Sequence, residues 1–129
     1  MRACKPFHLI GLETSISVLN AALRGEPTGS CRGFRGDAVA VAKRALKAGE
    51  TLDGEGGYTV YAKLIPAARS LSLGALPIGL ASHVKLLRDV AAGEIVKASD
   101  VALDDNAQAV RVRREMEGEA RQESKPAAA

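Results

Sequence analysis

The sequence predicts a mostly β domain of the α+β class, built from two similar strand-turn-strand halves. The first observation is an internal repeat, in which residues 41–52 align with residues 85–96. In each copy a short β-prone run leads through Ala-Gly-Glu into a second apolar pair. The second observation is that no strong helical pattern separates the copies. Because each copy has glycine where the chain must reverse, we expect pseudo-duplicated halves that form one compact body.

Residues 1–36 are expected to form a short helix and a linker, the end of an upstream domain. We expect Thr14 and Ser15 to cap the start of the helix and Gly25 to end it. An apolar stripe with helical spacing consists of Leu12, Ile16, Leu19 and Leu23. Since this face must pack on something, its partner is expected in a segment that precedes the chain.

Residues 37–105 are expected to form the β body. Val39 and Val41 alternate with two alanines, which predicts a half-buried strand. After the first Ala-Gly-Glu turn, a glycine-rich reversal at residues 53–57 leads into a strand at residues 58–61, whose aromatic and β-branched side chains favour extended structure.

The remaining segments carry weaker patterns. Residues 63–76 contain Pro66 and an Ala-rich stretch compatible with a short helix. Residues 99–103 are expected to close the second copy as an extended piece. Residues 106–129 are expected to form a charged C-terminal helix or tail, frayed from Arg121 onward.

The composition limits the size of the core and the class of partner. The chain has 129 residues, which is enough for one domain with a modest core. Hydrophobic residues make up 47% of it, with two Tyr, two Phe and no Trp, so the core is expected to be aliphatic. A net charge of +3 from 18 basic and 15 acidic residues predicts no nucleic-acid partner. No apolar run approaches the roughly 20 residues of a membrane span, so no membrane partner is expected.

The two cysteines bear on the redox environment of the protein. Cys4 and Cys31 are two thiols in a chain without a recognisable secretory leader. This favours reduced cysteines in a cytoplasmic protein over a disulfide framework, although a bridge between the two stays open.

The sequence carries no recognisable catalytic or cofactor motif. Gly54 and Gly56 lack a third glycine at the dinucleotide-binding spacing and a following helix, so the chain alone is expected to bind no cofactor. Two distant cysteines with His8 and His83 have no metal-ligand spacing, and no metal is expected. No catalytic residue is assigned.

Four basic residues near the Ala-Gly-Glu turns are candidate ligand-binding residues. Lys43 and Arg44 precede the first turn, and Lys85 and Arg88 precede the second. Gathered in a cleft, these side chains would bind a small carboxylate or a sugar acid. The alternative is that each arginine forms an ion pair with the glutamate of its own turn.

Three other residues are weaker candidates. Tyr58 is a candidate ligand platform; it lies three residues from Tyr61 on one predicted strand, so the two should face opposite sides, with one in the core. His8 and Glu13 lie at the junction before the linker, where a histidine beside a carboxylate could act as a base. The alternative for His8 is a hydrogen-bonded structural histidine.

With their two Ala-Gly-Glu turns, residues 37–105 resemble the SAF domain, an antifreeze-like β-clip module. SAF domains occur in sialic acid synthases, antifreeze-like proteins and flagellar chaperones. Each half matches in a strand, a turn and an apolar pair, and Ser99-Asp100-Val101 is similar to the end of the family's second half. The resemblance implies a β-clip fold and a role in ligand binding, in domain packing or as a chaperone-like module.

Three further segments look like the C-terminal end of homoserine-dehydrogenase-like NAD(P)-dependent oxidoreductases that carry a SAF domain. They are residues 5–13, residues 54–58 and residues 76–80. In those proteins a Rossmann domain binds NAD(P) and a middle domain supplies the active site. The resemblance implies that this chain is a non-catalytic C-terminal part of such an enzyme. Alternatively, it is a subunit that completes a dehydrogenase by associating with a Rossmann-containing chain. A homo-oligomer is compatible with either reading.

Overall fold

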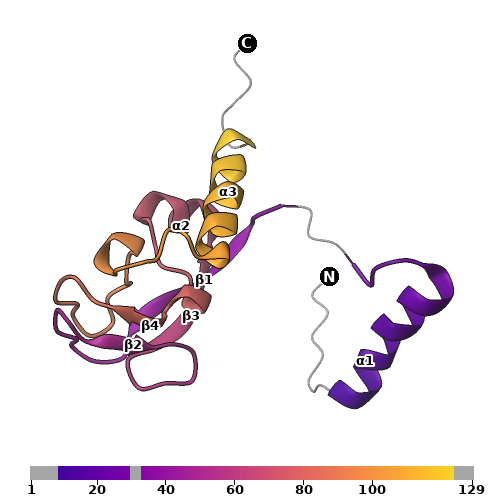
Figure 1. Ribbon diagram of the computed structural model, residues 1–129, viewed down its shortest axis with the longest axis horizontal. Helices are drawn as coiled ribbons and strands as arrows, with labels where there is room; N and C mark the ends of the chain where they lie inside the picture. Colours follow the sequence, from indigo (N-terminus) through magenta and orange to yellow (C-terminus); the bar gives the residue numbers. More distant parts are fainter. Residues whose placement is uncertain (1–8, 30–32, 124–129) are drawn as a thin grey trace, which may run out of the picture. The chain divides into compact units, whose positions relative to one another are not determined.

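The computed structural model describes residues 9–29 and 33–123, which belong to two compact units, Met1–Arg32 and Gly33–Ala129. The described residues form an α+β fold with small antiparallel sheets and three α-helices (Figure 1). The mixed fold class predicted from the sequence is therefore confirmed.

The first unit contains one helical segment. Helix α1, Ile10–Leu19, continues into a turn of π-helix, Asn20–Arg24. Gly25 ends this segment with a φ of +64°, as predicted, because glycine adopts the left-handed conformation without strain. No residue of α1 is buried.

The start of α1 differs from the prediction. The Glu13 carboxylate accepts a hydrogen bond from the Leu9 N–H at 3.0 Å, so the helix begins before the apolar stripe does. Thr14 and Ser15 therefore lie inside the helix, where their hydroxyl groups donate to carbonyl oxygens of the preceding turn. The expectation that these two residues cap the helix is wrong.

Two small sheets organise the second unit. Strand β1, Gly36–Ala42, pairs antiparallel with β3, Val60–Pro66. Strand β2, Thr51–Asp53, pairs antiparallel with β4, Ser82–Lys85.

From Val39 to Ala42, strand β1 is buried on both faces, so the expectation of a half-buried strand is wrong there. Residues 39–42 are all at most 1% exposed. Ala40 and Ala42 pack in the main hydrophobic cluster, whereas Val39 packs in a second cluster with Ile65. The alanines fill the side on which an alternating pattern would place solvent-facing residues.

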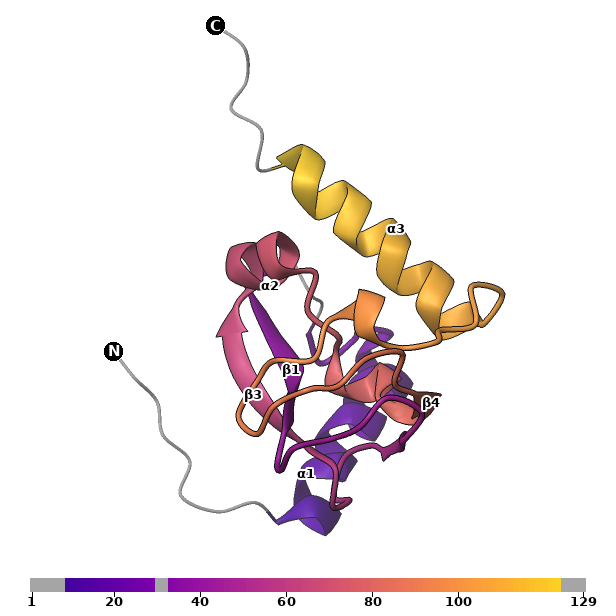
Figure 2. The same cartoon turned by 90° about the vertical axis from the view of Figure 1, so that its left-hand side faces the viewer.

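The helices of the second unit flank the sheets. Helix α2, Ala67–Leu73, follows β3 directly and agrees with the Ala-rich stretch. Helix α3, Gln108–Glu123, lies across the body beside the short 3-10 turn η3, Ala98–Asp100 (Figure 2). A second 3-10 turn, η2, spans Ile78–Leu80.

Two expectations about the C-terminal half are corrected. The segment expected to be extended at residues 99–103 begins inside η3, because the Asp100 carboxylate accepts a hydrogen bond from the Lys97 N–H at 2.8 Å. Val101 then pairs with Leu86 as an isolated bridge. The predicted tail from Arg121 is still helical as far as the end of α3, and residues 124–129 lie outside the described residues.

The core of the second unit is aliphatic, as the composition predicts. Its main cluster combines side chains from both copies of the repeat. The largest fully buried members are Leu46, Leu52, Leu76, Leu86, Val60, Val90 and Val96. The two copies therefore share one core.

Candidate functional site

The two Ala-Gly-Glu turns, residues 44–50 and 88–94, have the same local geometry; we call them the twin turns. In the first, Arg44 Nη2 donates to Glu50 Oε2 at 2.7 Å. In the second, Arg88 Nη2 donates to Glu94 Oε1 at 2.8 Å. Each glutamate also accepts a hydrogen bond from the N–H three residues before it. Each arginine also donates to the carbonyl oxygen of the next residue. The two segments therefore match residue by residue.

Backbone hydrogen bonds between the twin turns are reciprocal. The Leu46 N–H donates to the Val90 carbonyl oxygen at 2.8 Å, and the Val90 N–H donates back to Leu46 at 3.0 Å. The Gly49 N–H donates to the Leu86 carbonyl oxygen at 2.8 Å. At the equivalent positions in the other half, the Gly93 N–H donates to the Ala42 carbonyl oxygen, also at 2.8 Å. Each half therefore makes equivalent hydrogen bonds to the other, so the two halves are related by pseudo-twofold symmetry.

Gly49→Ala and Gly93→Ala should destabilise the protein by similar amounts, about 1 kcal/mol each. The φ angles are +87° and +77°, and an added Cβ would meet nothing within 4 Å, so the cost is backbone strain alone. Urea unfolding followed by circular dichroism measures the change. Gly79→Ala, with the same open space and no positive φ, is the control and should change stability by less than about 0.5 kcal/mol. A cost at only one of Gly49 and Gly93 would show that the turns are not equivalent.

Arg88 has a further partner that Arg44 lacks. Arg88 also donates to the buried Asp100 carboxylate, from Nε at 2.7 Å and from Nη2 at 2.9 Å. Burial raises the pKa of Asp100, but the hydrogen bonds from Arg88 and the Lys97 N–H outweigh it and leave that pKa below its usual range. The hydrogen bonds that Arg88 donates to Asp100 and to Glu94 raise the pKa of Arg88. In the first copy the position equivalent to Asp100 is Gly56, so Arg44 has no such partner.

The two predicted ligand-binding arginines form ion pairs with the glutamates of their own turns. This is the alternative that the sequence left open. Arg44 is bound by Glu50, and Arg88 by Glu94 and Asp100. Lys43 Nζ donates to the Gly57 carbonyl oxygen at 2.5 Å. The structure does not direct these three cations toward a shared ligand.

The remaining candidates are dispersed. Lys85 is the exposed last residue of β4, opposite Thr51. Tyr58 is 88% exposed and Tyr61 is 42% exposed, so the expectation that one tyrosine belongs to the core is wrong. The reason is that β3 begins at Val60, which takes the core position, while Tyr58 stays in the loop. Glu13 caps α1, and His8 lies outside the described residues.

The glycine-rich reversal at residues 53–57 is organised by one carboxylate. Asp53 accepts hydrogen bonds from the Tyr58 N–H at 2.5 Å, from the Thr59 N–H at 3.0 Å, and from the Thr59 hydroxyl. These bonds, the one from the Thr59 hydroxyl above all, lower the pKa of Asp53 to about 2. A Cβ at Gly57 would collide with this carboxylate, so the glycine serves the turn.

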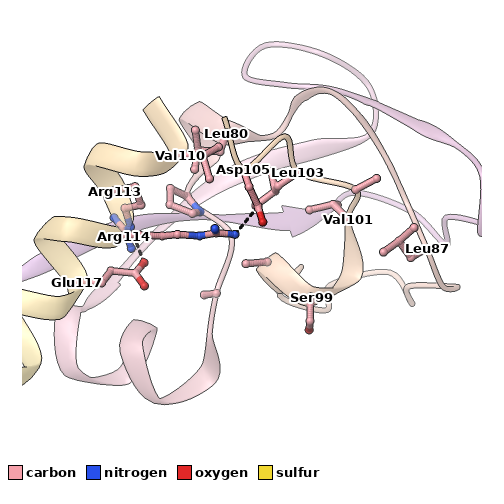
Figure 3. Close-up of a pocket in the computed structure, with 14 residues that line it drawn as sticks. Leu80, Leu87, Ser99, Val101, Leu103, Asp105, Val110, Arg113, Arg114 and Glu117 are labelled. Atoms are coloured by element: carbon pink, nitrogen blue, oxygen red, sulfur yellow. Dashed lines mark hydrogen bonds and ion pairs between the residues drawn. The ribbon is translucent and has the colours of Figure 1, made fainter. Parts of the chain in front are cut away.

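A pocket of about 460 Å³ lies between α3 and the segments around η2 and η3. In Figure 3 its apolar walls include Leu80, Val101, Leu103 and Val110. Polar side chains at the pocket are Ser99, Asp105, Arg113, Arg114 and Glu117. No sequence pattern pointed to this pocket, because its walls come from separate segments of the chain.

The charges around the pocket are paired. Arg114 Nη2 lies 2.6 Å from Asp105 Oδ1, and Figure 3 shows this ion pair beside the apolar wall. Arg113 Nε donates to Glu117 Oε1 at 2.6 Å. The pocket is therefore an apolar hollow whose nearby charges neutralise one another.

A buried ion pair fixes α3 to β1. Arg113 donates to both oxygens of Asp37, from Nη1 at 3.1 Å and from Nη2 at 2.5 Å. Asp37 also accepts the Ser70 hydroxyl at 2.5 Å, and the guanidinium lies 4.9 Å from the centre of the Phe34 ring. Burial lowers the pKa of Arg113, but its hydrogen bonds to Asp37 and Glu117 outweigh this and raise the pKa. The position of α3, and hence the pocket, depends on this pair.

Metal and membrane sites are not found in the part of the chain that the structure describes. Among residues 9–29 and 33–123, no three His, Cys, Asp or Glu side chains are grouped so that they could hold a metal ion. None of the helices described has the length and apolar character needed to cross a membrane. Comparison with protein-family models and with curated proteins finds no match to this chain.

Proposed function

We propose that this chain is a non-catalytic, SAF-like β-clip module that packs against the Rossmann-containing part of a cytoplasmic, homoserine-dehydrogenase-like oxidoreductase. In this proposal the partner part binds NAD(P). The sequence left open whether the module binds a carboxylate or packs against another domain. Packing is favoured, because the guanidinium groups of Arg44 and Arg88 are already bound within their own turns.

The observation that carries the proposal is the exposed apolar stripe of the N-terminal helical segment. Its side chains are 53% to 79% exposed, and no residue of α1 is buried. The stripe consists of Leu12, Ile16, Leu19 and Leu23. Burying such a side chain is worth about 1.5–3 kcal/mol, so a partner surface would stabilise this helix substantially.

The pocket beside α3 supports the same role. Its walls are apolar, and the charges near it are paired as Arg113 with Glu117 and as Arg114 with Asp105. An apolar side chain of a partner domain could enter without leaving a buried charge unpaired. A small anionic ligand would have to displace the carboxylate of Glu117 or Asp105 from its arginine.

The test is calorimetric titration of the full chain with two kinds of probe. With NAD(H) or NADP(H) alone, no saturable heat is expected. With a purified Rossmann-containing fragment of a homoserine-dehydrogenase-like oxidoreductase, saturable binding is expected. Saturable dinucleotide binding by the chain alone would overturn the non-catalytic assignment.

Two variants locate the contact. Ile16→Lys places a charge on the stripe and should abolish binding of the fragment. Thr14→Lys adds the same charge on the opposite side of the helix, and binding should persist. Equal loss in both variants, or in neither, would contradict packing through the stripe. Binding of a separately produced fragment would also favour the alternative in which the chain completes a dehydrogenase as a separate subunit.

A further inference from the structure

Helix α3 is attached to the rest of the second unit by few apolar contacts. Of residues 108–122, only Val110 is buried, at 5% exposed. The half-buried side chains of the helix, two of which carry a charge, are Arg113, Met116, Glu117 and Ala120. A surface helix usually buries a continuous apolar stripe along one face. Because α3 lacks such a stripe, hydrophobic burial contributes little to holding it in place.

The space beside α3 is not filled by side chains. The pocket of about 460 Å³ lies between this helix and the segments around η2 and η3, and Val110 is part of its wall. In Figure 3, α3 forms one side of this hollow. Side chains that line a void have no contact atoms on one side and lose the corresponding dispersion energy. Packing therefore holds α3 less firmly than it holds the strands of the core.

The polar attachment of α3 is made by side chains, chiefly by one. Arg113 donates two hydrogen bonds to the buried carboxylate of Asp37. Arg121 Nη2 lies 3.4 Å from the Leu71 carbonyl oxygen, which is near the upper limit for a hydrogen bond. Among the described residues, no backbone-to-backbone hydrogen bond links α3 to residues 34–103. The helix can therefore leave without breaking a backbone bond of either sheet.

A turn with its own local hydrogen bonds precedes the helix. The Asn106 N–H donates to Asp104 Oδ1 at 2.9 Å, and the Ala107 N–H donates to the Asp104 carbonyl oxygen at 3.0 Å. Arg114 of α3 forms its ion pair with Asp105 of the same turn. These bonds join residues close together in the chain, so they do not require α3 to be docked. The turn is therefore suited to act as a hinge.

We propose that α3 is a lid, hinged at residues 104–107, that opens as one unit while the two sheets stay folded. Arg113 is the side chain that holds the lid closed. Opening removes one side of the pocket and leaves an open apolar surface that includes Leu80, Val101 and Leu103. The lid thus sets how much of this surface a partner can reach. The proposal concerns the chain alone and does not depend on the partner proposed above.

Native-state hydrogen exchange of the full chain in increasing urea tests the lid. An undocked helix of 16 residues is only marginally stable in water, so opening exposes its amides to exchange. After correction for intrinsic rates, the amides of residues 112–119 should exchange at least about 100-fold faster than those of Ala40 and Ala42, with a much weaker dependence on urea. Exchange of α3 at the rate and urea dependence of Ala40 and Ala42 would overturn the proposal. Protection that falls stepwise toward the C-terminal end of α3 would also overturn it, because the helix would then fray and not open as a unit.

Two valine truncations separate opening of the lid from unfolding of the whole unit. Val110→Ala removes the one buried apolar side chain among residues 108–122 and should speed exchange of α3 at least about fivefold. Val90→Ala is the matched control, because Val90 belongs to the main hydrophobic cluster and does not line the pocket. It should speed exchange at Ala40 and Ala42 at least about fivefold and change exchange of α3 by less than about twofold. Equal acceleration of α3 in both variants would show that the helix opens only when the whole unit unfolds, and would overturn the lid.

Discussion

Arg113→Ala should destabilise the protein by about 3–5 kcal/mol, the cost of leaving one member of a buried ion pair without its partner. The Asp37 side chain is only 6% exposed and receives two hydrogen bonds from Arg113. Without them, Asp37 keeps the hydroxyl of Ser70 as its partner. Urea unfolding followed by circular dichroism measures the loss, and detachment of α3 should appear as rapid amide exchange along that helix.

The neighbouring arginine provides the control. Arg114→Ala removes an exposed ion pair with Asp105 and should leave the unfolding midpoint nearly unchanged. Adding Asp37→Asn to Arg113→Ala removes the uncompensated charge and should restore part of the stability. If both single arginine variants behave alike, the buried pair does not hold α3.

Asp100→Ala should cost about 2–3 kcal/mol, because it removes charge-assisted hydrogen bonds made in a buried position. Asp100 accepts two bonds from Arg88 and one from the Lys97 N–H. Asp89→Ala is the matched control: its carboxylate is exposed beside Lys47, and its loss should leave the unfolding midpoint nearly unchanged. Chemical unfolding at pH 7 measures both.

The Asp100 contribution should depend on pH in a defined direction. The pKa of Asp100 is lower in the folded protein than its ordinary value. Its stabilisation is therefore fully present above the ordinary aspartate pKa and is lost as the pH falls through the lower, folded value. The stability difference between wild type and Asp100→Ala should shrink in that acidic range. A difference that grows on acidification would contradict the assigned ion pair.

The twin turns could be predicted from the sequence because their determinants are local. Gly49 and Gly93 each follow an alanine and precede a glutamate, and the glutamate binds backbone and side chain within its own turn. Such short-range contacts leave a pattern that repeats with the duplication. The shared core follows from the same pattern, since each copy contributes apolar residues that neither can bury alone.

The buried ion pair and the pocket could not be predicted, because they join residues far apart in the chain. Asp37 and Arg113 are 76 residues apart, and no local pattern links the start of an apolar strand to one arginine of a charged helix. The burial of β1 was also missed, since alanine is compatible with either face of a strand. The position of Tyr58 depended on where β3 begins, which propensity alone does not decide.

We expect the arginines of the twin turns to hold the fold and not to bind a ligand. The most direct test is NMR titration of the full chain with N-acetylneuraminate, followed at the Nε–H signals of Arg44 and Arg88. Because both guanidinium groups are bound by carboxylates of their own halves, neither signal should shift saturably at millimolar ligand. A saturable shift of both signals with a common Kd would contradict this role and make the twin turns a carboxylate-binding site.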